Sequence, residues 1–596
     1  MPDVSNTVIA DALEELGDLY ELDGAIVHRV LAYRRAAQSV RESARSVGGL
    51  AQAGRATELA GIGATLQEKI LALVQTGAIP AAERLREQFP PGLLALTRLP
   101  GVGAKRARLL QRELGIDSLQ ALREAALAQR LRTVKGLGPK FETSVLAALD
   151  ELAAESDGEE NELPRRATRL LLPAALELGA ALTEGLHTQG PTDADVRIAG
   201  SARRGADAVK DLDLVAVTEH PQELTQALGR LDEIERVAST SVAGARGRTH
   251  SGVAIDLRIA TPAQLGNLLQ HFTGSAAHNA TLRTRAVRAG LHVSEYGVLD
   301  DADGASRMCA TEAEVYELLG LPWIAPELRE DRGELEAAAR GELPRLIELG
   351  DIRGDLHCHT VASDGRATIA EMARAARDRG YEYLAITDHS ASHGFGNGVS
   401  PGELAAQIER IAELDARLEG IELLAGSEVN ILPDGSLDYA DELLARLDWV
   451  VASVHTAFGM SQERMTERMI AAIEHPLVDA IGHPTGRLIQ RREPYAVDLA
   501  AIFAAAARTG TLLEINGNPD RRDLCETHAR AAAAAGARLV IDSDAHRTQT
   551  VANMRWGVLT ARRAWLTPAD VANTLPWPEL ARRRKRTTPR GATPRS

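Results

Sequence analysis

The chain carries histidine and carboxylate residues at spacings that suit a metal site. In the stretch GDLHCHTVASDG, residues 354–365, His357 and His359 flank one residue and Asp364 follows. Residues two apart in an extended segment project from the same face. The later apolar runs end in further residues of these types, namely His389, Glu428, His455, His483, Asp544 and His546. Strand-ending repeats that together supply nine imidazole and carboxylate groups indicate one metal cluster rather than scattered polar residues.

This set of ligands predicts a phosphoester hydrolase site. Nine nitrogen and oxygen ligands without cysteine exceed the capacity of one tetrahedral ion, so we expect two or three zinc, manganese or iron ions. Ions of this kind lower the pKa of a bridging water and bind phosphate oxygens. His393, His475 and His528 lie outside the pattern and are interpreted as ordinary polar residues, with His393 the best candidate for a supporting role.

A second group of carboxylates lies earlier in the chain. Asp211 and Asp213 are two apart in the strand-like run DLDLVAV, and Asp256 lies in a second apolar run, VAIDLRI. A single pair of this kind is usually an outward-facing part of a half-buried strand. Clustered carboxylates, however, repel one another unless a cation lies between them. A pair of Mg²⁺ ions, as in two-metal phosphoryl transfer, satisfies that requirement, because all-oxygen sites favour hard cations.

Three Gly-x-Gly turns, each followed by a helical pattern, occur in the first 150 residues. They are LAGIGATLQEKI (59–70), LPGVGAKRARLL (99–110) and VKGLGPKFETSV (134–145). Such a turn leaves backbone N–H groups at the positive end of a helix dipole, which suits a phosphate oxygen. We therefore predict helix-hairpin-helix units that bind the DNA backbone without reading sequence. The residues assigned to this contact are Gly61, Gly63, Gly101, Gly103, Lys105 and Arg106.

The elements that must position these residues change in type along the chain. Residues 8–150 have helical periodicity, and the region around the three aspartates alternates as strands do. Beyond Asp351, the apolar runs YLAIT, IELLAG, WVVASV, VDAIG, TLLEIN and RLVID alternate with helical stretches. This alternation predicts a parallel sheet, whose closed form is a barrel.

The length of 596 residues predicts three to five domains. The predicted boundaries are a helical domain at 1–88, a fingers-like helical domain at 89–150, a linker at 151–166, a palm at 167–260, a thumb at 261–325, a linker at 326–350, a barrel at 351–577 and a basic disordered tail at 578–596. Three dispersed cysteines argue against a disulfide framework or a thiolate zinc site. Without an apparent signal peptide or membrane span, we expect a soluble cytoplasmic protein, acting as a monomer.

The palm region resembles a family X DNA polymerase. The resemblance rests on Gly200-Ser201-x-Arg203-Arg204, Asp211-x-Asp213 and Asp256, and continues into the thumb-like segments HFTGSAAHNATLR and SEYGV. It implies that the three aspartates are catalytic and hold two Mg²⁺ ions. It also implies that the nucleotide is bound by Gly200, Ser201, Arg204, Phe272, Gly274 and Asn279. His271 stands where that family commonly has tyrosine, which bears on discrimination against ribonucleotides.

The N-terminal helices are similar to the 5′-phosphate-binding and deoxyribose-phosphate lyase unit of the same family. The segments AIVHRVLAYRRAA and QEKI place His28, Arg29 and Tyr33 at phosphate-pocket positions and Lys69 at the Schiff-base position. Thr57 and Thr65 stand where animal relatives have lysines, so less positive charge is available to lower the pKa of Lys69. Lyase activity is therefore only an optional part of the prediction.

The segment from Asp351 to about Trp577 resembles the PHP (polymerase and histidinol phosphatase) domain, with all nine ligand positions filled. Together the resemblances identify the chain as a bacterial family X DNA polymerase with a C-terminal PHP domain. The implied fold is a helix-hairpin-helix region, an α+β nucleotidyltransferase palm with a thumb, and a distorted (β/α)7 barrel. The implied function is gap filling on gapped or nicked duplex DNA with deoxynucleoside triphosphates in base excision repair, with 3′-5′ exonuclease activity from a barrel that holds two to three Mn²⁺ or Zn²⁺ ions.

Two alternatives of other classes remain at this stage. One is a nuclease or phosphatase acting on DNA ends, in which the polymerase half binds DNA and is only weakly active. The other is a scaffold without enzymatic activity that docks on DNA. The complete aspartate triad argues against the first, because a binding relic does not need three costly carboxylates, and the complete ligand set argues against the second.

Overall fold

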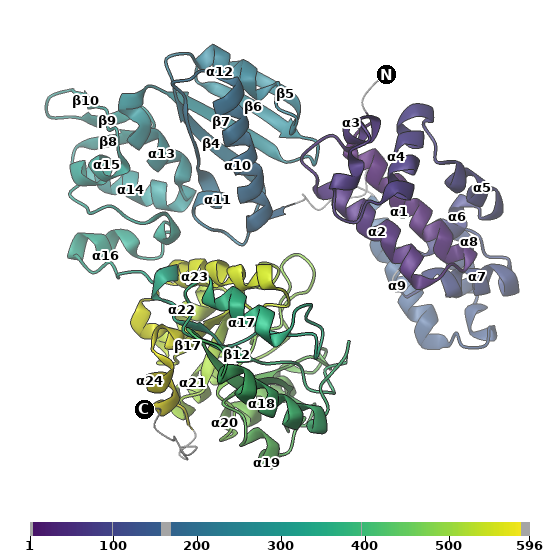
Figure 1. Cartoon of the computed structure of the whole chain (residues 1–596). Coiled ribbons are helices and arrows are strands. Elements are labelled where there is room, and N and C mark those ends of the chain that lie inside the picture. The colour runs from purple at the N-terminus through teal and green to yellow at the C-terminus, as the bar shows by residue number, and fades with distance from the viewer. Residues whose placement is uncertain (1–3, 98, 100, 157–168, 395, 586–596) are drawn as a thin grey trace. The chain divides into compact units, whose positions relative to one another are not determined.

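The computed structural model describes residues 4–97, 99, 101–156, 169–394 and 396–585 (Figure 1). The chain forms two compact units. The first contains residues 1–170, 177–198 and 210–261, and the second contains residues 171–176, 199–209 and 262–596. The nucleotide-binding segment predicted around Ser201 therefore belongs to the same unit as the thumb and the barrel, whereas the three aspartates belong to the first unit.

The N-terminal part of the first unit is helical, as predicted. Its helices are α1 (Asn6–Asp23), α2 (Val27–Glu42), α3 (Val47–Gln52), α4 (Ala64–Thr76), α5 (Pro80–Gln88), α6 (Pro91–Thr97), α7 (Gly103–Leu114), α8 (Leu119–Leu127) and α9 (Pro139–Ser156). Their apolar residues form one continuous core from Ile9 to Leu149. The turns of the predicted hairpins contain glycines with positive φ, including Gly61 at 83° and Gly101 at 83°, a conformation that side chains with a Cβ rarely adopt.

The rest of the first unit is built around a five-stranded sheet with the order β2-β4-β7-β6-β5. The strands are β2 (Asp195–Ile198), β4 (Asp211–Val217), β5 (Ile234–Ser241), β6 (Gly244–Thr249) and β7 (Ala254–Ala260), accompanied by α12 (Pro221–Leu228) and by α10 (Leu172–Gln189) from residue 177 onward. Strands β4 and β7 pair in parallel, and the other pairs are antiparallel. The central pair is thus the one that carries the predicted catalytic aspartates.

In the second unit, the short helix α11 (Gly200–Arg203) and strand β3 (Ala208–Val209) precede the thumb. The thumb contains α13 (Leu265–Thr273), α14 (Ala276–Arg288), α15 (Glu312–Leu318) and an antiparallel sheet of β8 (Leu291–Ser294), β9 (Gly297–Asp300) and β10 (Ser306–Arg307). The residues predicted as a linker, 326–350, include α16 (Glu334–Arg340), and Leu335 and Leu346 share a core with Leu282 and Tyr316.

The C-terminal part of the second unit is a nearly closed parallel barrel. Its strands are β11 (Gly354–Asp355), β12 (Tyr383–Ile386), β13 (Glu422–Asn430), β14 (Trp449–Ser453), β15 (Ala480–Ile481), β16 (Leu512–Asn516) and β17 (Leu539–Asp542), which pair in this order. A parallel bridge between Cys358 and Ala545 brings the first and last strands together. The predicted apolar runs form six of these strands, and β11 is the seventh.

Helices surround the barrel strands (Figure 1). They are α17 (Ile369–Arg377), α18 (Pro401–Asp415), α19 (Asp441–Leu444), α20 (Gln462–Glu474), α21 (Leu499–Thr509), α22 (Glu526–Ala534), α23 (Met554–Arg563) and α24 (Trp577–Arg582). Apolar side chains from the strands and the helices form a large core. The predicted fold class is confirmed by this barrel and by the helical N-terminal region.

Two predicted segments lie partly outside the described residues. These are the linker at 151–166, from residue 157 onward, and the basic tail at 578–596, from residue 586 onward. Among the described residues, the helices are all too short or too polar to cross a membrane.

Candidate active sites

The barrel strands bring the predicted metal ligands to one edge. His357 and His359 follow β11, His389 follows β12, and Glu428 lies near the end of β13. The remaining strand-end ligands are His455 after β14, His483 after β15, and Asp544 and His546 after β17. Parallel strands with helical crossovers place all their carboxyl ends on one side, which is where barrel enzymes keep their active sites.

Glu428 is at the centre of the cluster. Its Oε2 atom lies 2.8 Å from His389 Nδ1 and 3.3 Å from His357 Nε2. Its Oε1 atom lies 2.9 Å from His483 Nε2 and 3.1 Å from His455 Nε2. One carboxylate thus reaches imidazoles from four other strand ends.

Three sets of ligand atoms converge closely enough to hold an ion each, with the atoms of every set within 4.8 Å of one another. The sets are His359, Asp364, His389 and His546; His357, His359 and Asp544; and His389, Glu428 and His455. His359 and His389 each belong to two sets, so the three sites are contiguous. The number of ions stays a prediction.

The buried donors of the cluster fit metal ions. Among the described residues, His357 Nε2, both ring nitrogens of His359 and Glu428 Oε2 are buried and make no hydrogen bond of good geometry, although other ligand atoms lie within 2.8–3.3 Å of some of them. Leaving such groups unsatisfied is costly, and coordination of a divalent cation would satisfy them. The mixture of imidazole and carboxylate without thiolate suits zinc, manganese or iron and excludes none of them.

The electrostatics of the cluster reflect the same crowding. Burial and the neighbouring His546 and His389 lower the pKa of His359 to about 4. Burial opposes ionisation of Glu428, but the imidazoles around it hold its pKa well below the usual range. The neutral imidazole and ionised carboxylate that these directions favour for His359 and Glu428 are the forms that bind metal.

Two residues of β16 were missed by the sequence analysis. Glu514 Oε1 lies 2.6 Å from His357 Nδ1, and its Oε2 atom accepts a hydrogen bond from the His483 backbone N–H. Asn516 Nδ2 donates to Glu514 Oε2 at 3.1 Å and to Asp544 Oδ2 at 3.0 Å. The run TLLEIN carried the signal, because it too ends in polar residues. These side chains orient ligands from behind.

The ligands open into a hollow of about 340 Å³ that also contains cationic side chains. Besides Asp364, His389 and Asp544, it is lined by Arg521 and Arg547. Arg521 Nε lies 3.7 Å from Asp544 Oδ2. Guanidinium groups beside a metal cluster can bind phosphate oxygens by charge-assisted hydrogen bonds. The sequence analysis did not assign a role to either arginine.

Of the three histidines outside the pattern, His393 does adjoin the cluster. Its ring is buried and stacks on His389, with centroids 4.6 Å apart, and its Nδ1 atom lies 2.8 Å from the Ser390 carbonyl oxygen. His475 instead pairs with Asp441 at the surface, with 3.2 Å between Nε2 and Oδ1. His528 interacts with Cys525. Burial alone would raise the pKa of Cys525, but the interaction with His528 helps to lower it.

In the first unit, the predicted catalytic aspartates lie on adjacent parallel strands. Asp213 on β4 is the register partner of Asp256 on β7, and Asp211 is two residues before Asp213 on the same strand. The side chain of Asp256 pairs with Arg258 at 2.7 Å and with Arg246 at 3.3 Å. The three carboxylates therefore share one end of the sheet, and Asp256 is held by cations.

In the second unit, several predicted nucleotide-binding residues make internal contacts. Arg204, which follows α11 with Gly200 and Ser201, donates from Nη1 to the Thr273 carbonyl oxygen at 2.6 Å and pairs with Glu330 at 3.1 Å. Asn279 on α14 accepts from Gln270 at 2.8 Å and donates to the His271 carbonyl oxygen at 2.7 Å. Phe272 and Gly274 lie at the end of α13.

The residues predicted to bind DNA phosphates lie at helix starts. Gly63 is the N-cap of α4, and Gly103 is the first residue of α7. Lys105 is exposed. Arg106 instead donates to the Gly101 carbonyl oxygen, and its guanidinium carbon lies 5.2 Å from the Phe141 ring centroid. Both turns thus face outward at the positive ends of helices.

The residues predicted for a lyase are spread over α2 and α4. His28 and Arg29 are exposed at the start of α2, and Arg29 lies 3.8 Å from the Tyr20 ring centroid. Tyr33 is buried, and burial together with Tyr20 raises its pKa to about 12. Lys69 is half-buried on α4. Lyase activity stays a prediction.

Comparison with known proteins places these sites in context. Residues 4–79 match the family described as a helix-hairpin-helix domain, and residues 93–151 match a SAM-like helix-hairpin-helix tandem. Residues 268–330 match the DNA polymerase beta thumb, and residues 355–518 match the PHP domain. These matches cover the hairpins, the thumb and most of the barrel.

A protein of Bacillus subtilis strain 168 named DNA polymerase/3′-5′ exonuclease PolX is 37% identical over 569 residues, which cover 94% of this chain and 96% of that protein. A protein of Thermoanaerobacter sp. strain X514 named as a probable phosphatase is 32% identical over 234 residues, or 37% of this chain and 89% of that protein. The chain combines a segment that matches the DNA polymerase beta thumb with a barrel that matches the PHP domain. It belongs to the bacterial family X DNA polymerases with a C-terminal PHP domain.

Proposed function

We propose that this protein fills short gaps in DNA during repair, using deoxynucleoside triphosphates, and that its PHP barrel removes nucleotides from 3′ ends. The observation that carries the first activity is the register pairing of Asp213 with Asp256, which gathers three carboxylates at one end of a parallel strand pair. The observation that carries the second is the convergence of three ligand sets beside Arg521 and Arg547.

At the palm, Asp211, Asp213 and Asp256 are the residues that would hold two Mg²⁺ ions. Carboxylate oxygens suit this cation, and such a pair of ions supplies charge stabilisation for in-line phosphoryl transfer. Asp256 would also accept the proton of the primer 3′-hydroxyl. Arg258 and Arg246 form ion pairs with Asp256. For nucleotide transfer, Asp256 must break at least one of these ion pairs so that its carboxylate can bind a metal ion.

At the barrel, the nine ligands would hold two to three Mn²⁺ or Zn²⁺ ions. Ions in such a site supply a nucleophilic water at neutral pH and neutralise phosphate oxygens. Arg521 and Arg547 would orient the scissile phosphate by charge-assisted hydrogen bonds. Glu514 holds the ring of His357 and Asn516 holds Asp544, so the donors are oriented before a substrate arrives.

A gapped duplex labelled at the primer 5′ end tests both activities. With nucleotides we expect elongation, and without them shortening. Asp256→Ala should lower incorporation by orders of magnitude with DNA affinity little changed, and Asp195→Ala, a carboxylate on β2 of the same sheet, should have no such effect. His357→Ala with His359→Ala should abolish shortening and spare elongation. Elongation by Asp256→Ala at the parental rate would refute the palm assignment.

A second candidate is an enzyme that processes DNA ends and polymerises weakly. It is favoured by the internal contacts of Arg204 and Asn279, because both side chains would have to exchange partners to bind a nucleotide. In that case the same duplex would be shortened in the presence of nucleotides, and oligonucleotides with a 3′-phosphate would lose the phosphate.

A further inference from the structure

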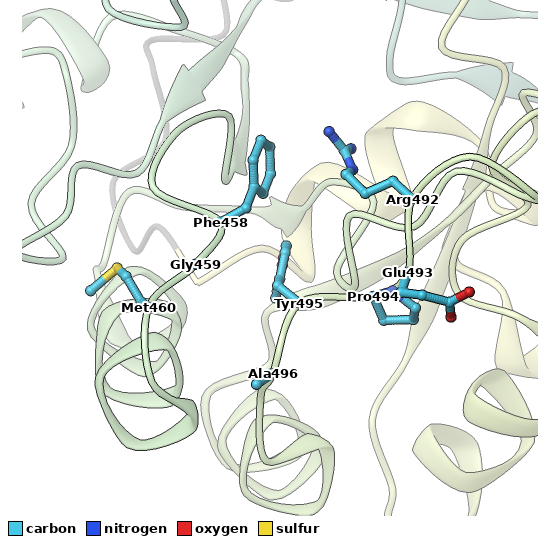
Figure 2. A pocket seen from close by; sticks show the side chains of 8 residues that line it. All are labelled: Phe458, Gly459, Met460, Arg492, Glu493, Pro494, Tyr495 and Ala496. Carbon is cyan, nitrogen blue, oxygen red and sulfur yellow. The ribbon is translucent and has the colours of Figure 1, made fainter. Parts of the chain in front are cut away.

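A second hollow, of about 390 Å³, lies between two loops of the barrel (Figure 2). The first loop contains Phe458 and Met460, and the second contains Arg492 and Tyr495. We call this hollow the loop pocket. No part of the metal site lines it, and neither proposed activity uses it.

The two loops start at metal ligands. Phe458 is three residues after His455, and the second loop follows His483. Three residues span at most ~10 Å, which is the rise of about three stacked nucleotides at ~3.4 Å each. A strand whose phosphodiester lies at the metal cluster therefore has its nearest nucleotides within reach of Phe458.

The loop pocket presents a planar stack. The Arg492 guanidinium carbon lies 4.3 Å from the Phe458 ring centroid, and the Phe458 and Tyr495 rings are stacked at 6.2 Å with an angle of 21° between their planes. In Figure 2, Phe458 and Arg492 extend from the two loops toward the same side of the hollow, with Tyr495 between the loops. Phe458 is only half-buried, so part of this residue is open to solvent.

The stack is held in place from behind. Arg492 Nε donates to the Gly486 carbonyl oxygen at 2.8 Å, and the buried Tyr495 donates from its hydroxyl to the Pro484 carbonyl oxygen at 2.7 Å. Under the first loop, the buried Arg468 donates to the Thr456 carbonyl oxygen at 2.9 Å. Because these contacts fix both loops, little ordering cost would remain when a ligand stacks.

We propose that the loop pocket binds an unpaired base of the DNA strand whose 3′ phosphodiester lies at the metal cluster. This rests on the proposed exonuclease activity. Aromatic rings and arginine planes are the groups on which single-stranded bases stack, and stacking tolerates any base because each has a π face. The positive charge of Arg492 suits the adjoining phosphates, and the two loops follow β14 and β15, at the same strand ends as the metal ligands.

The test uses single-stranded oligonucleotides labelled at the 5′ end, in which a tetrahydrofuran abasic unit replaces the base at each of the last three positions in turn. Loss of one base should lower kcat/KM of the parental enzyme by ~10-fold. Phe458→Leu keeps an apolar side chain but removes the ring. Its kcat/KM on the normal oligonucleotide should already be ~10-fold below that of the parental enzyme, and the abasic unit should not lower it further. Phe458→Trp should behave like the parental enzyme, and Arg492→Lys should lose part of the discrimination.

A binding measurement does not depend on hydrolysis. In the presence of a chelator, 2-aminopurine is placed at the position where the abasic unit lowers kcat/KM most. Its fluorescence should be quenched by the parental protein and by Phe458→Trp, but not by Phe458→Leu. Equal rates on normal and abasic oligonucleotides, or quenching unchanged in Phe458→Leu, would overturn the base pocket. If the parental enzyme shortened no oligonucleotide, the proposed exonuclease would fail, while the quenching would still decide the pocket. Equal melting temperatures of the variants exclude misfolding.

Discussion

Among single residues, Glu514 has the clearest supporting role in the barrel site. It is buried, and its Oε1 atom lies 2.6 Å from Nδ1 of His357, which leaves Nε2 of that ring to face the cluster. A carboxylate behind a histidine ligand fixes the tautomer and increases the basicity of the ring. Glu514 thus acts on a metal through another residue.

We expect Glu514→Gln to lower metal affinity by about 10- to 100-fold, because the amide cannot provide the same negative charge to His357. Competition of the protein with a chromogenic chelator measures this. Glu382→Gln, which removes an exposed carboxylate paired with Arg353 on the same barrel, is the matched control. Equal affinities for the two variants would mean that His357 is oriented by the barrel backbone alone.

At the scale of elements, a buried ion-pair group connects α11 to the thumb. Glu312, the first residue of α15, pairs with Arg203 on α11 and with Arg329, in both cases at 2.6 Å. Burial opposes ionisation of Glu312, but the two arginines lower its pKa to about 2. A carboxyl whose folded-state pKa is depressed stabilises the fold above its ordinary pKa of 4.5, and this stabilisation is lost as pH falls toward 2.

Glu312→Gln should therefore destabilise the thumb by about 3–5 kcal/mol at neutral pH, because it leaves Arg203 and Arg329 without their buried counter-charge. Hydrogen exchange of α13 and α15 in the full chain measures this locally. The exposed Glu317→Gln on the same helix is the control. In the parental chain, protection of α13 and α15 against hydrogen exchange should fall between pH 4.5 and 2, and Glu312→Gln should lose this dependence on pH. If Glu312→Gln kept the dependence, another group would be responsible for it.

The hairpin turns are a second feature at the element scale. If they bind phosphates, DNA affinity should fall steeply with salt, and Lys105→Ala with Arg106→Ala should reduce the slope of log affinity against log salt by up to about one for each lost contact. Arg112→Ala, at the far end of α7, is the matched control. We expect Lys105 to contribute more, because Arg106 bonds to Gly101. An unchanged slope would place the DNA contact elsewhere.

At the scale of the whole molecule, the second unit joins the predicted nucleotide-binding segment to the PHP barrel. The fully buried Arg522 donates to the Gly205 carbonyl oxygen at 3.0 Å and pairs with Asp207 at 3.1 Å. Arg563 on α23 donates to the Arg204 carbonyl oxygen at 2.7 Å. Arg521, the neighbour of Arg522 in sequence, lines the metal site. One barrel loop thus contacts the predicted nucleotide-binding segment and lines the hollow at the metal ligands.

Arg522→Ala should raise KM for the incoming nucleotide by about tenfold, because the segment carrying Ser201 and Arg204 loses a buried anchor, while 3′-end hydrolysis by the barrel is retained. Steady-state incorporation on a gapped duplex measures KM. Arg555→Ala, an exposed arginine on α23, is the control. A change in kcat with KM unaltered would show that Arg522 does not act through nucleotide binding.

The sequence by itself determined the ligand types and the edge at which they meet. Six of the nine predicted barrel ligands follow apolar runs, and parallel strands separated by helices must place their carboxyl ends together. The same local logic located Asp211, Asp213 and the glycine turns, because two-residue alternation and positive φ are properties of a few adjacent residues. Where ligands gather could therefore be predicted without coordinates.

Only the tertiary structure decided which residues support the ligands and which anchor the nucleotide segment. Glu514 is 157 residues from His357, and Arg522 is 317 residues from Gly205. Spacing rules describe contacts within a helix or a strand pair, whereas these contacts depend on the packing of whole elements against one another. The partners of Arg204 were hidden for the same reason, because Thr273 and Glu330 are 69 and 126 residues away in sequence.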